Sequence, residues 1–201
     1  MTGVGQTITV LWRALGPRSV PFLLATFARL PAYKRGLLAR EPDPKRAAFY
    51  DLAAPAMLLY RRLRERLGQE RALALKREIV TPVGVRLFER DFRRERLPRT
   101  WENLLRLLEE MGDRPTTRWN VKEVVERSER RYHLRVTWCM YHAVFTREGM
   151  GELTPLFCDV DERFFEVHLP GWLRFHRGGP GHTLGYGHPY CEFIFEREQG
   201  P

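Results

Sequence analysis

The sequence predicts an α+β protein, in which N-terminal helices are followed by a small antiparallel sheet packed with helices. Apolar residues recur at helical spacing as far as Met111, and after Pro115 the period changes to the alternation typical of strands. With 201 residues, 43% of them hydrophobic, the chain is long enough to bury a sizeable core. We therefore expect a helical region over residues 1–99 and an α+β module over 100–201, together forming one compact domain.

The helices of the first region are marked by breakers and caps. Residues 6–40 read as one or two short helices interrupted at Gly16 and Pro17. Asp43 and Pro44 are typical of a helix start, and the following helix ends near Gly68. A second long helix is expected over 69–91. Thr100 is the expected N-cap of a third helix, which Gly112 ends.

The second region combines strands and helices. Residues 119–125 predict a strand with a bulge near Val124, and 132–138 alternate like a half-buried strand, so the two form an antiparallel hairpin. Helices are expected over 140–148 and 154–168. Two more strands, 173–176 and 190–196, flank the glycine-rich segment 178–187.

The net charge of +9 is unevenly distributed. Residues 1–100 carry 21 Lys and Arg against 9 Asp and Glu, whereas residues 101–201 carry 13 against 16. A basic half can meet nucleic acid, anionic lipid or an acidic partner. Because the Arg residues alternate with Glu along helices and no nucleic-acid motif is found, we expect a solvated face and no nucleic-acid partner.

The N-terminus lacks the features of a signal peptide, and the apolar run 20–28 is too short to span a bilayer. We expect no integral membrane segment. The run fits a membrane surface, a packed helix or a contact with a second subunit, so a homo-oligomer remains one alternative. The chain has three cysteines, and this odd number indicates reduced thiols in a cytoplasmic setting.

All Cys and His residues lie after residue 130, so any chemistry is expected in the C-terminal third. Cys139 stands between a strand and a helix, where the helix dipole lowers a thiol pKa; His142 on the same face is either its base or an exposed residue beside a buried cysteine. Cys158 and Asp161 share a helix face, on which Asp161 orients a ligand amine, relays a proton or pairs with an Arg. Cys191 alternates with Phe193 on the inner face of the last strand, where it is either an inert core cysteine or, because glycines precede it, part of a ligand site.

Two Cys/His pairs also have the spacing of zinc ligands, Cys139 with His142 and His188 with Cys191. A structural zinc usually serves small proteins that lack a core, and this chain has one. We therefore expect no metal.

Several stretches of the second region resemble the L-2-amino-thiazoline-4-carboxylic acid hydrolase family. A cysteine ends a strand, a second lies in a Cys-x-x-Asp unit and a third follows a Gly-x-x-x-Cys-x-Phe unit; the stretches are 136–139, 149–161, 174–177 and 187–193. The resemblance covers about residues 100–197. It implies hydrolytic opening of a cyclic, sulfur-containing amidine that carries a carboxylate, and it implies no cofactor.

The first hypothesis is therefore a hydrolase of small cyclic C–N substrates. In it Cys139 or Cys158 is the nucleophile or activating thiol, Asp161 relays a proton, and Cys191 completes the catalytic group. His142, Gly187 and His188 are the expected substrate-binding residues, with the glycine-rich loop as a wall. The alternative is a small-molecule-binding or sensory domain without turnover, similar to 4-vinyl-reductase-like domains. In both cases the thiols and Asp161 should converge.

Overall fold

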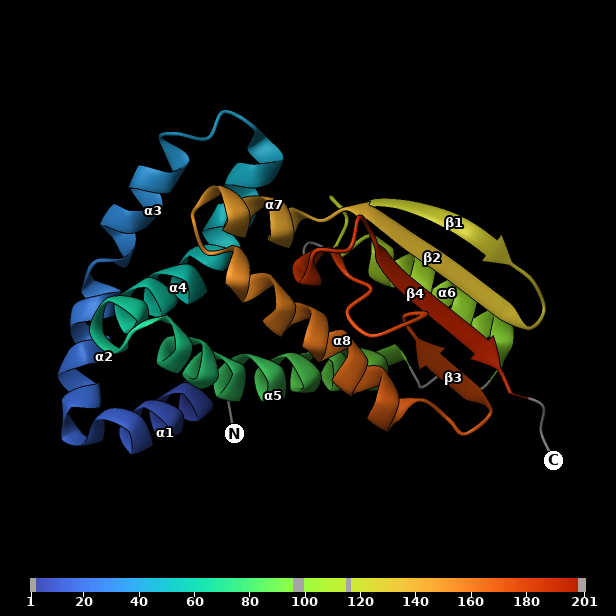
Figure 1. Cartoon of the computed structure of the whole chain (residues 1–201), viewed down its shortest axis with the longest axis horizontal. Helices are drawn as coiled ribbons and strands as arrows, with labels where there is room; N and C mark the ends of the chain where they lie inside the picture. The colour runs from blue at the N-terminus through green and yellow to red at the C-terminus, as the bar shows by residue number, and fades with distance from the viewer. Residues whose placement is uncertain (1–2, 96–99, 115–116, 199–201) are drawn as a thin grey trace. The chain divides into compact units, whose positions relative to one another are not determined.

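The computed structural model describes residues 3–95, 100–114 and 117–198, without the side chains of residues 90–95 and of His168 (Figure 1). It has the expected α+β architecture, with helices first and a four-stranded antiparallel sheet after them. The chain divides into two compact units, Met1–Val83 and Gly84–Pro201. Within the described residues, no helix is both long and apolar enough to cross a bilayer.

The first unit is entirely helical. The segment expected to hold one or two helices contains three, α1 (Gly3–Leu15), α2 (Ser19–Ala28) and α3 (Leu30–Leu38), with a short 3-10 turn, η1 (Gly16–Arg18), at the expected break. Helix α4 (Pro44–Leu67) begins after Asp43, whose carboxylate accepts hydrogen bonds from the main-chain N–H of Lys45 and Arg46. It ends at Gly68, where φ is +80°. The expected cap and stop of this helix are both confirmed.

Helix α5 (Gln69–Glu95) runs through Pro82 and crosses from the first unit into the second. Helix α6 (Trp101–Gly112) begins after Thr100, whose side chain accepts a hydrogen bond from the N–H of Asn103. Two helices of the second unit lie in the predicted places, α7 (Met140–Arg147) and α8 (Thr154–His168). The termini of these helices are local features of the sequence, so they were predictable.

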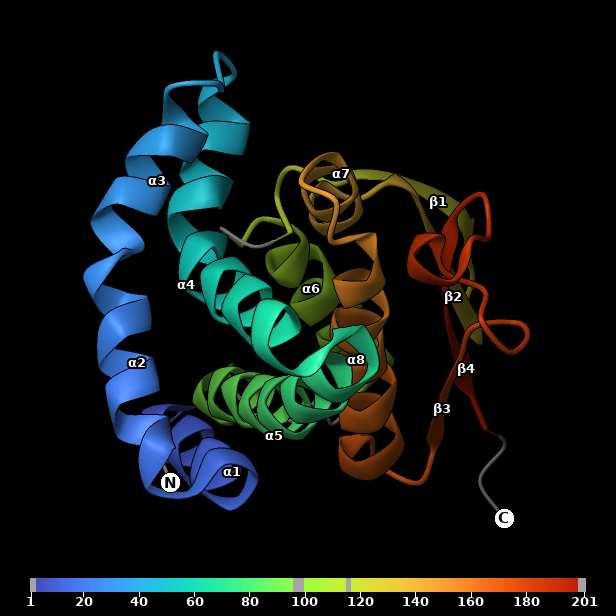
Figure 2. The ribbon, with the colours of Figure 1, turned by 60° about the vertical axis from the view of Figure 1, so that its left-hand side comes forward.

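The sheet has the strand order β1-β2-β4-β3, built from β1 (Val121–Arg127), β2 (Arg131–Trp138), β3 (Leu173–His176) and β4 (Cys191–Arg197). The predicted hairpin is confirmed, and its register shifts between Val124 and Glu126, where a bulge was expected. Figure 2 shows helices α6 and α8 on one side of this sheet. Aromatic side chains fill the space between these elements, among them Trp101, Phe164, Phe165 and Phe195.

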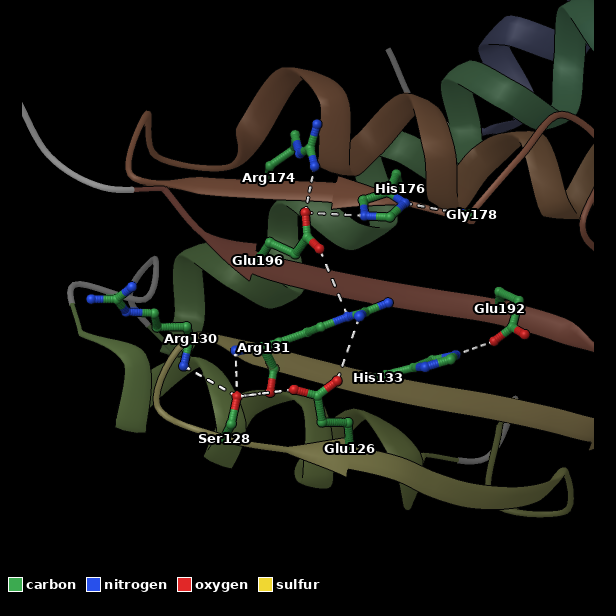
Figure 3. Close-up of polar contacts among 10 residues, drawn as sticks. All are labelled: Glu126, Ser128, Arg130, Arg131, His133, Arg174, His176, Gly178, Glu192 and Glu196. Carbon is green, nitrogen blue, oxygen red and sulfur yellow. Dashed lines mark hydrogen bonds and ion pairs between the residues drawn. The ribbon is translucent and has the colours of Figure 1, made fainter.

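The opposite face of the sheet carries a chain of ion pairs (Figure 3). Arg174 and His176 of β3 both contact Glu196 of β4, and Glu196 also lies 3.7 Å from Arg131 of β2. Nearer the start of β4, His133 hydrogen-bonds the Glu192 carboxylate, and both residues are buried. Because β2 and β4 are central strands, these polar pairs link three strands across the sheet.

Candidate active site

Cys139 caps α7 directly after β2, as the sequence predicted. The main-chain N–H groups of Tyr141 and His142 stabilise its thiolate form, which is the helix-terminus effect. Burial outweighs that effect and, together with smaller contributions from Cys158 and Asp161, raises the pKa of Cys139 to about 11. The expected lowering of this thiol pKa is therefore wrong, because the site is too well buried.

Cys158 lies in the second turn of α8. Burial raises the pKa of this thiol to about 12, whereas the Thr183 hydroxyl acts in the opposite direction. Cys191, the first residue of β4, receives a hydrogen bond from the N–H of Leu184 at 3.2 Å from its sulfur, and burial raises its pKa to about 11. All three cysteines are free thiols.

The three thiols come from three segments of the second unit, and each influences the titration of another. Cys158 adds to the rise in the pKa of Cys139, Cys191 adds to that of Cys158, and Cys139 adds to that of Cys191. Asp161 acts on each of them in the same direction. The structure thus brings together the four residues that the sequence analysis placed in a catalytic group, whose role stays a prediction.

Asp161 is held by Arg177, the residue after β3. The guanidinium Nη2 donates a hydrogen bond to Oδ2 of Asp161 over 3.1 Å, and Nε lies 3.0 Å from Oε1 of Glu162. Burial raises the pKa of Asp161 to about 6, although Arg177 opposes the rise by its charge and its hydrogen bond. The carboxyl group therefore titrates close to neutral pH.

Arg177 itself is fixed from several sides. Its side chain is only 2% exposed. Nη1 donates a hydrogen bond to the main-chain oxygen of Glu192 over 3.0 Å, and the guanidinium lies over the ring of Phe193 at 4.3 Å. A buried guanidinium needs such partners, because an unpaired charge there is costly. The position of Arg177 depends on packing across three elements, so the sequence pattern did not reveal that it pairs with Asp161.

The loop that joins β3 to β4, residues 177–190, borders the thiols. It contains a 3-10 turn, η3 (Leu184–Tyr186), which ends at Gly187 in the left-handed conformation. A Cβ atom on Gly185 would lie 3.1 Å from the sulfur of Cys158 and 3.1 Å from the N atom of Pro155. Glycine thus allows the loop backbone to approach the thiol. The Tyr186 hydroxyl donates a hydrogen bond to Asp159 of α8 over 2.7 Å.

The structure places the three expected substrate-binding residues around this loop and α7. Gly187 ends the 3-10 turn, and the ring of His188 stacks on that of His182 at 4.5 Å. His188 also meets the edge of Tyr190, over which Arg135 lies. His142 reaches Cys139 through its main chain, and its ring Nδ1 is buried without a hydrogen-bond partner within the described part of the chain. Their binding role remains a prediction.

Tyr141 is a further member of the site that the sequence analysis missed. Its ring packs on Phe157 at 4.8 Å, and burial together with Cys139 and Asp161 raises the pKa of its hydroxyl. The signal for it was its position two residues after Cys139. Over the described ranges, no three His, Cys, Asp or Glu side chains are arranged to hold a metal ion.

The fold and this group define a class of protein: an α+β protein whose C-terminal unit holds three buried or half-buried thiols beside a carboxylate and a guanidinium. A model of the L-2-amino-thiazoline-4-carboxylic acid hydrolase family matches residues 46–195, and the chain belongs to this family. The match begins in α4, well before the C-terminal stretches on which the resemblance rested. No curated protein and no solved structure matches the chain.

Proposed function

We propose that this protein hydrolyses a small cyclic C–N substrate of the amidine or thiazoline type that carries a carboxylate. The observation that carries the proposal is the grouping of Cys139, Cys158, Cys191 and Asp161 in a chain of this family. Such a group supplies a nucleophile and a base, which are the two functions that hydrolytic ring opening requires.

The thiol pKa values decide how the group works. With values of about 11 and about 12, Cys139 and Cys158 are protonated at neutral pH and are weak nucleophiles by themselves. Either one therefore needs a base when it attacks. Asp161, with a pKa of about 6, is mostly ionised at neutral pH and suits that role.

In the proposed reaction, the sulfur of Cys139 or Cys158 bonds to the amidine carbon while its proton moves to Asp161. The proton then passes to the ring atom whose bond to this carbon breaks, which opens the ring. Water adds to the same carbon, and the thiol leaves with a proton. Arg177 acts through Asp161, because it holds the carboxylate in place and keeps its pKa from rising further.

The test is incubation of the purified protein with L-2-amino-thiazoline-4-carboxylate, followed by mass spectrometry. We expect a product heavier by one water, and we expect Asp161→Asn to slow its formation by at least about 100-fold. Asp159→Asn is the matched control, since this carboxylate of the same helix pairs with Tyr186. Equal rates for wild type and Asp161→Asn would contradict the proposed base.

The second candidate is a binding domain without turnover. The observation in its favour is that burial keeps all three thiols protonated, which suits a pocket wall as well as a nucleophile. Calorimetry with the same compound separates the two functions. Binding with no product over many hours would favour the binding domain, whereas product formation excludes it.

A further inference from the structure

The first forty residues of the chain contain six Lys and Arg residues and no Asp or Glu. This is the most one-sided stretch of charge in the protein. Arg18 and Arg29 flank helix α2 directly, and Arg35 lies in α3; all three are exposed. Two of the six pair with acidic residues of later helices, Arg13 with Glu78 and Lys34 with Asp51, whereas the segment itself has no acidic residue to balance its charge.

The same segment exposes apolar side chains in regular rows. On α1, Val4, Ile8 and Trp12 follow one another at intervals of four residues, so they share one face of the helix. They are 46% to 70% exposed, whereas Val10 and Leu11 of the same helix are buried. Helix α1 thus packs through one side and leaves a second apolar side uncovered.

Helix α2 repeats the arrangement. Phe22 and Thr26 are buried, while the outward row of Val20, Leu24 and Phe27 is 44% to 68% exposed. A helix that is apolar on both its packed and its open side is unusual on a protein surface exposed to water. We call these two rows the N-terminal apolar rows; they consist of Val4, Ile8, Trp12, Val20, Leu24 and Phe27.

We propose that α1 and α2 lie on an anionic membrane surface, with the N-terminal apolar rows inserted among the lipid headgroups. Peripheral membrane helices combine these features: exposed Leu, Phe and Trp, with Arg or Lys beside them. Trp favours the headgroup level because its ring is apolar and its N–H is polar. Anionic lipids supply the negative charge that the segment lacks.

A second copy of this chain fits the rows less well. Pairing two copies through the same face would bring together two segments that each contain six Lys and Arg and no Asp or Glu, and like charges repel. A neutral apolar partner would offer no negative charge to the exposed Arg18, Arg29 and Arg35. Charge complementarity therefore favours the lipid surface over self-association.

The test is co-sedimentation of the full chain with sucrose-loaded vesicles. Vesicles of two parts phosphatidylcholine and one part phosphatidylglycerol should bind the protein at least about tenfold more tightly than pure phosphatidylcholine. High salt should weaken this binding, because it screens the attraction. Equal binding to both vesicles, or no binding to either, would overturn the proposal.

Two variants locate the surface. Leu24→Glu should reduce binding at least about tenfold, since it places a carboxylate in an apolar row. The matched control is Val124→Glu, because Val124 is 52% exposed on β1 and lies outside the N-terminal segment. Circular dichroism confirms that both variants fold. Equal loss of binding from both would overturn the placement on α1 and α2.

Sedimentation equilibrium without lipid tests the other occupant. We expect the wild-type protein and Leu24→Glu to have the same mass in solution. A wild-type dimer that Leu24→Glu dissociates would show that a second copy covers the rows, and the proposal would fail. This experiment does not depend on the ring-opening activity, so the two proposals stand or fall separately.

Discussion

Two opposing effects set the pKa of Asp161. Burial favours its protonated form, and the guanidinium of Arg177 favours the carboxylate, with the pKa at about 6 as the outcome. The sequence analysis placed Asp161 beside Cys158 on α8 and included an Arg among its partners, because a buried carboxylate needs one. It could not say which Arg, since Arg177 reaches Asp161 from a strand that is remote in sequence.

This balance predicts a pH profile. If Asp161 accepts a proton during ring opening, only its ionised form is active, so kcat/KM should fall about tenfold per pH unit below a pKa near 6. Above that value the rate should level off. Steady-state rates for L-2-amino-thiazoline-4-carboxylate across the acidic range measure the profile. A profile that stays flat down to pH 4 would contradict the assignment.

Gly185 gives a second prediction at the scale of one residue. Its missing Cβ leaves room for Cys158, so Gly185→Ala should push the loop away from the thiol and cost about 1–3 kcal/mol of stability. Urea unfolding measures this loss. The control is Gly171→Ala, where no atom lies within 4 Å of the added Cβ. If both variants lose equal stability, the close approach at Cys158 does not contribute to the free energy of unfolding.

At the scale of elements, the close crossing of α5 and α8 depends on Gly84. A Cβ atom on Gly84 would lie 2.6 Å from Cγ1 of Val160, which is closer than atoms can pack. We expect Gly84→Ala to destabilise the fold by about 1–3 kcal/mol despite the higher helix propensity of Ala. Urea unfolding again provides the measurement.

A compensating change tests the cause of that loss. Val160→Ala removes both methyl groups that the new Cβ would strike, so the double variant should be more stable than Gly84→Ala alone. Gly36→Ala in α3 serves as the control, because its added Cβ meets nothing and should stabilise the helix slightly. Additive losses in the double variant would show that steric conflict is not the reason.

Elements bounded by local signals were predictable, and those that depend on partners were less so. The caps at Asp43 and Thr100 act within a few residues, so their helices were placed correctly from sequence. The burial of His133 was not foreseen, because alternation assigned it to the open face of β2. It depends on Glu192, which only the pairing of β2 with β4 brings close.

At the scale of the whole molecule, the sequence predicts a basic helical scaffold and a separate C-terminal site. The family match from residue 46 includes much of the helical part, so family membership alone does not mark this boundary. The test that the sequence suggests concerns Arg93 and Arg94, whose side chains lie outside the described part of the structure.

We expect replacement of Arg93 and Arg94 by Ala to change ligand affinity less than about twofold, because their helical spacing among Glu residues predicts surface charges, which contribute little singly. By comparison, Asp161→Asn should weaken binding of the ligand. Titration calorimetry with L-2-amino-thiazoline-4-carboxylate measures both variants. A comparable loss in the Arg variant would show that the end of α5 contributes to the site, for example by pairing with the ligand carboxylate.

The edge position of β1 affects how copies of this protein meet at high concentration. An edge strand offers unpaired main-chain groups to other chains, and β1 also exposes Val121, Val124 and Val125. Its register shifts twice along β2, however, and Glu123 and Glu126 lie on the same strand. A strand from another copy would meet an interrupted hydrogen-bonding pattern and two carboxylates, which discourages growth of the sheet into fibrils.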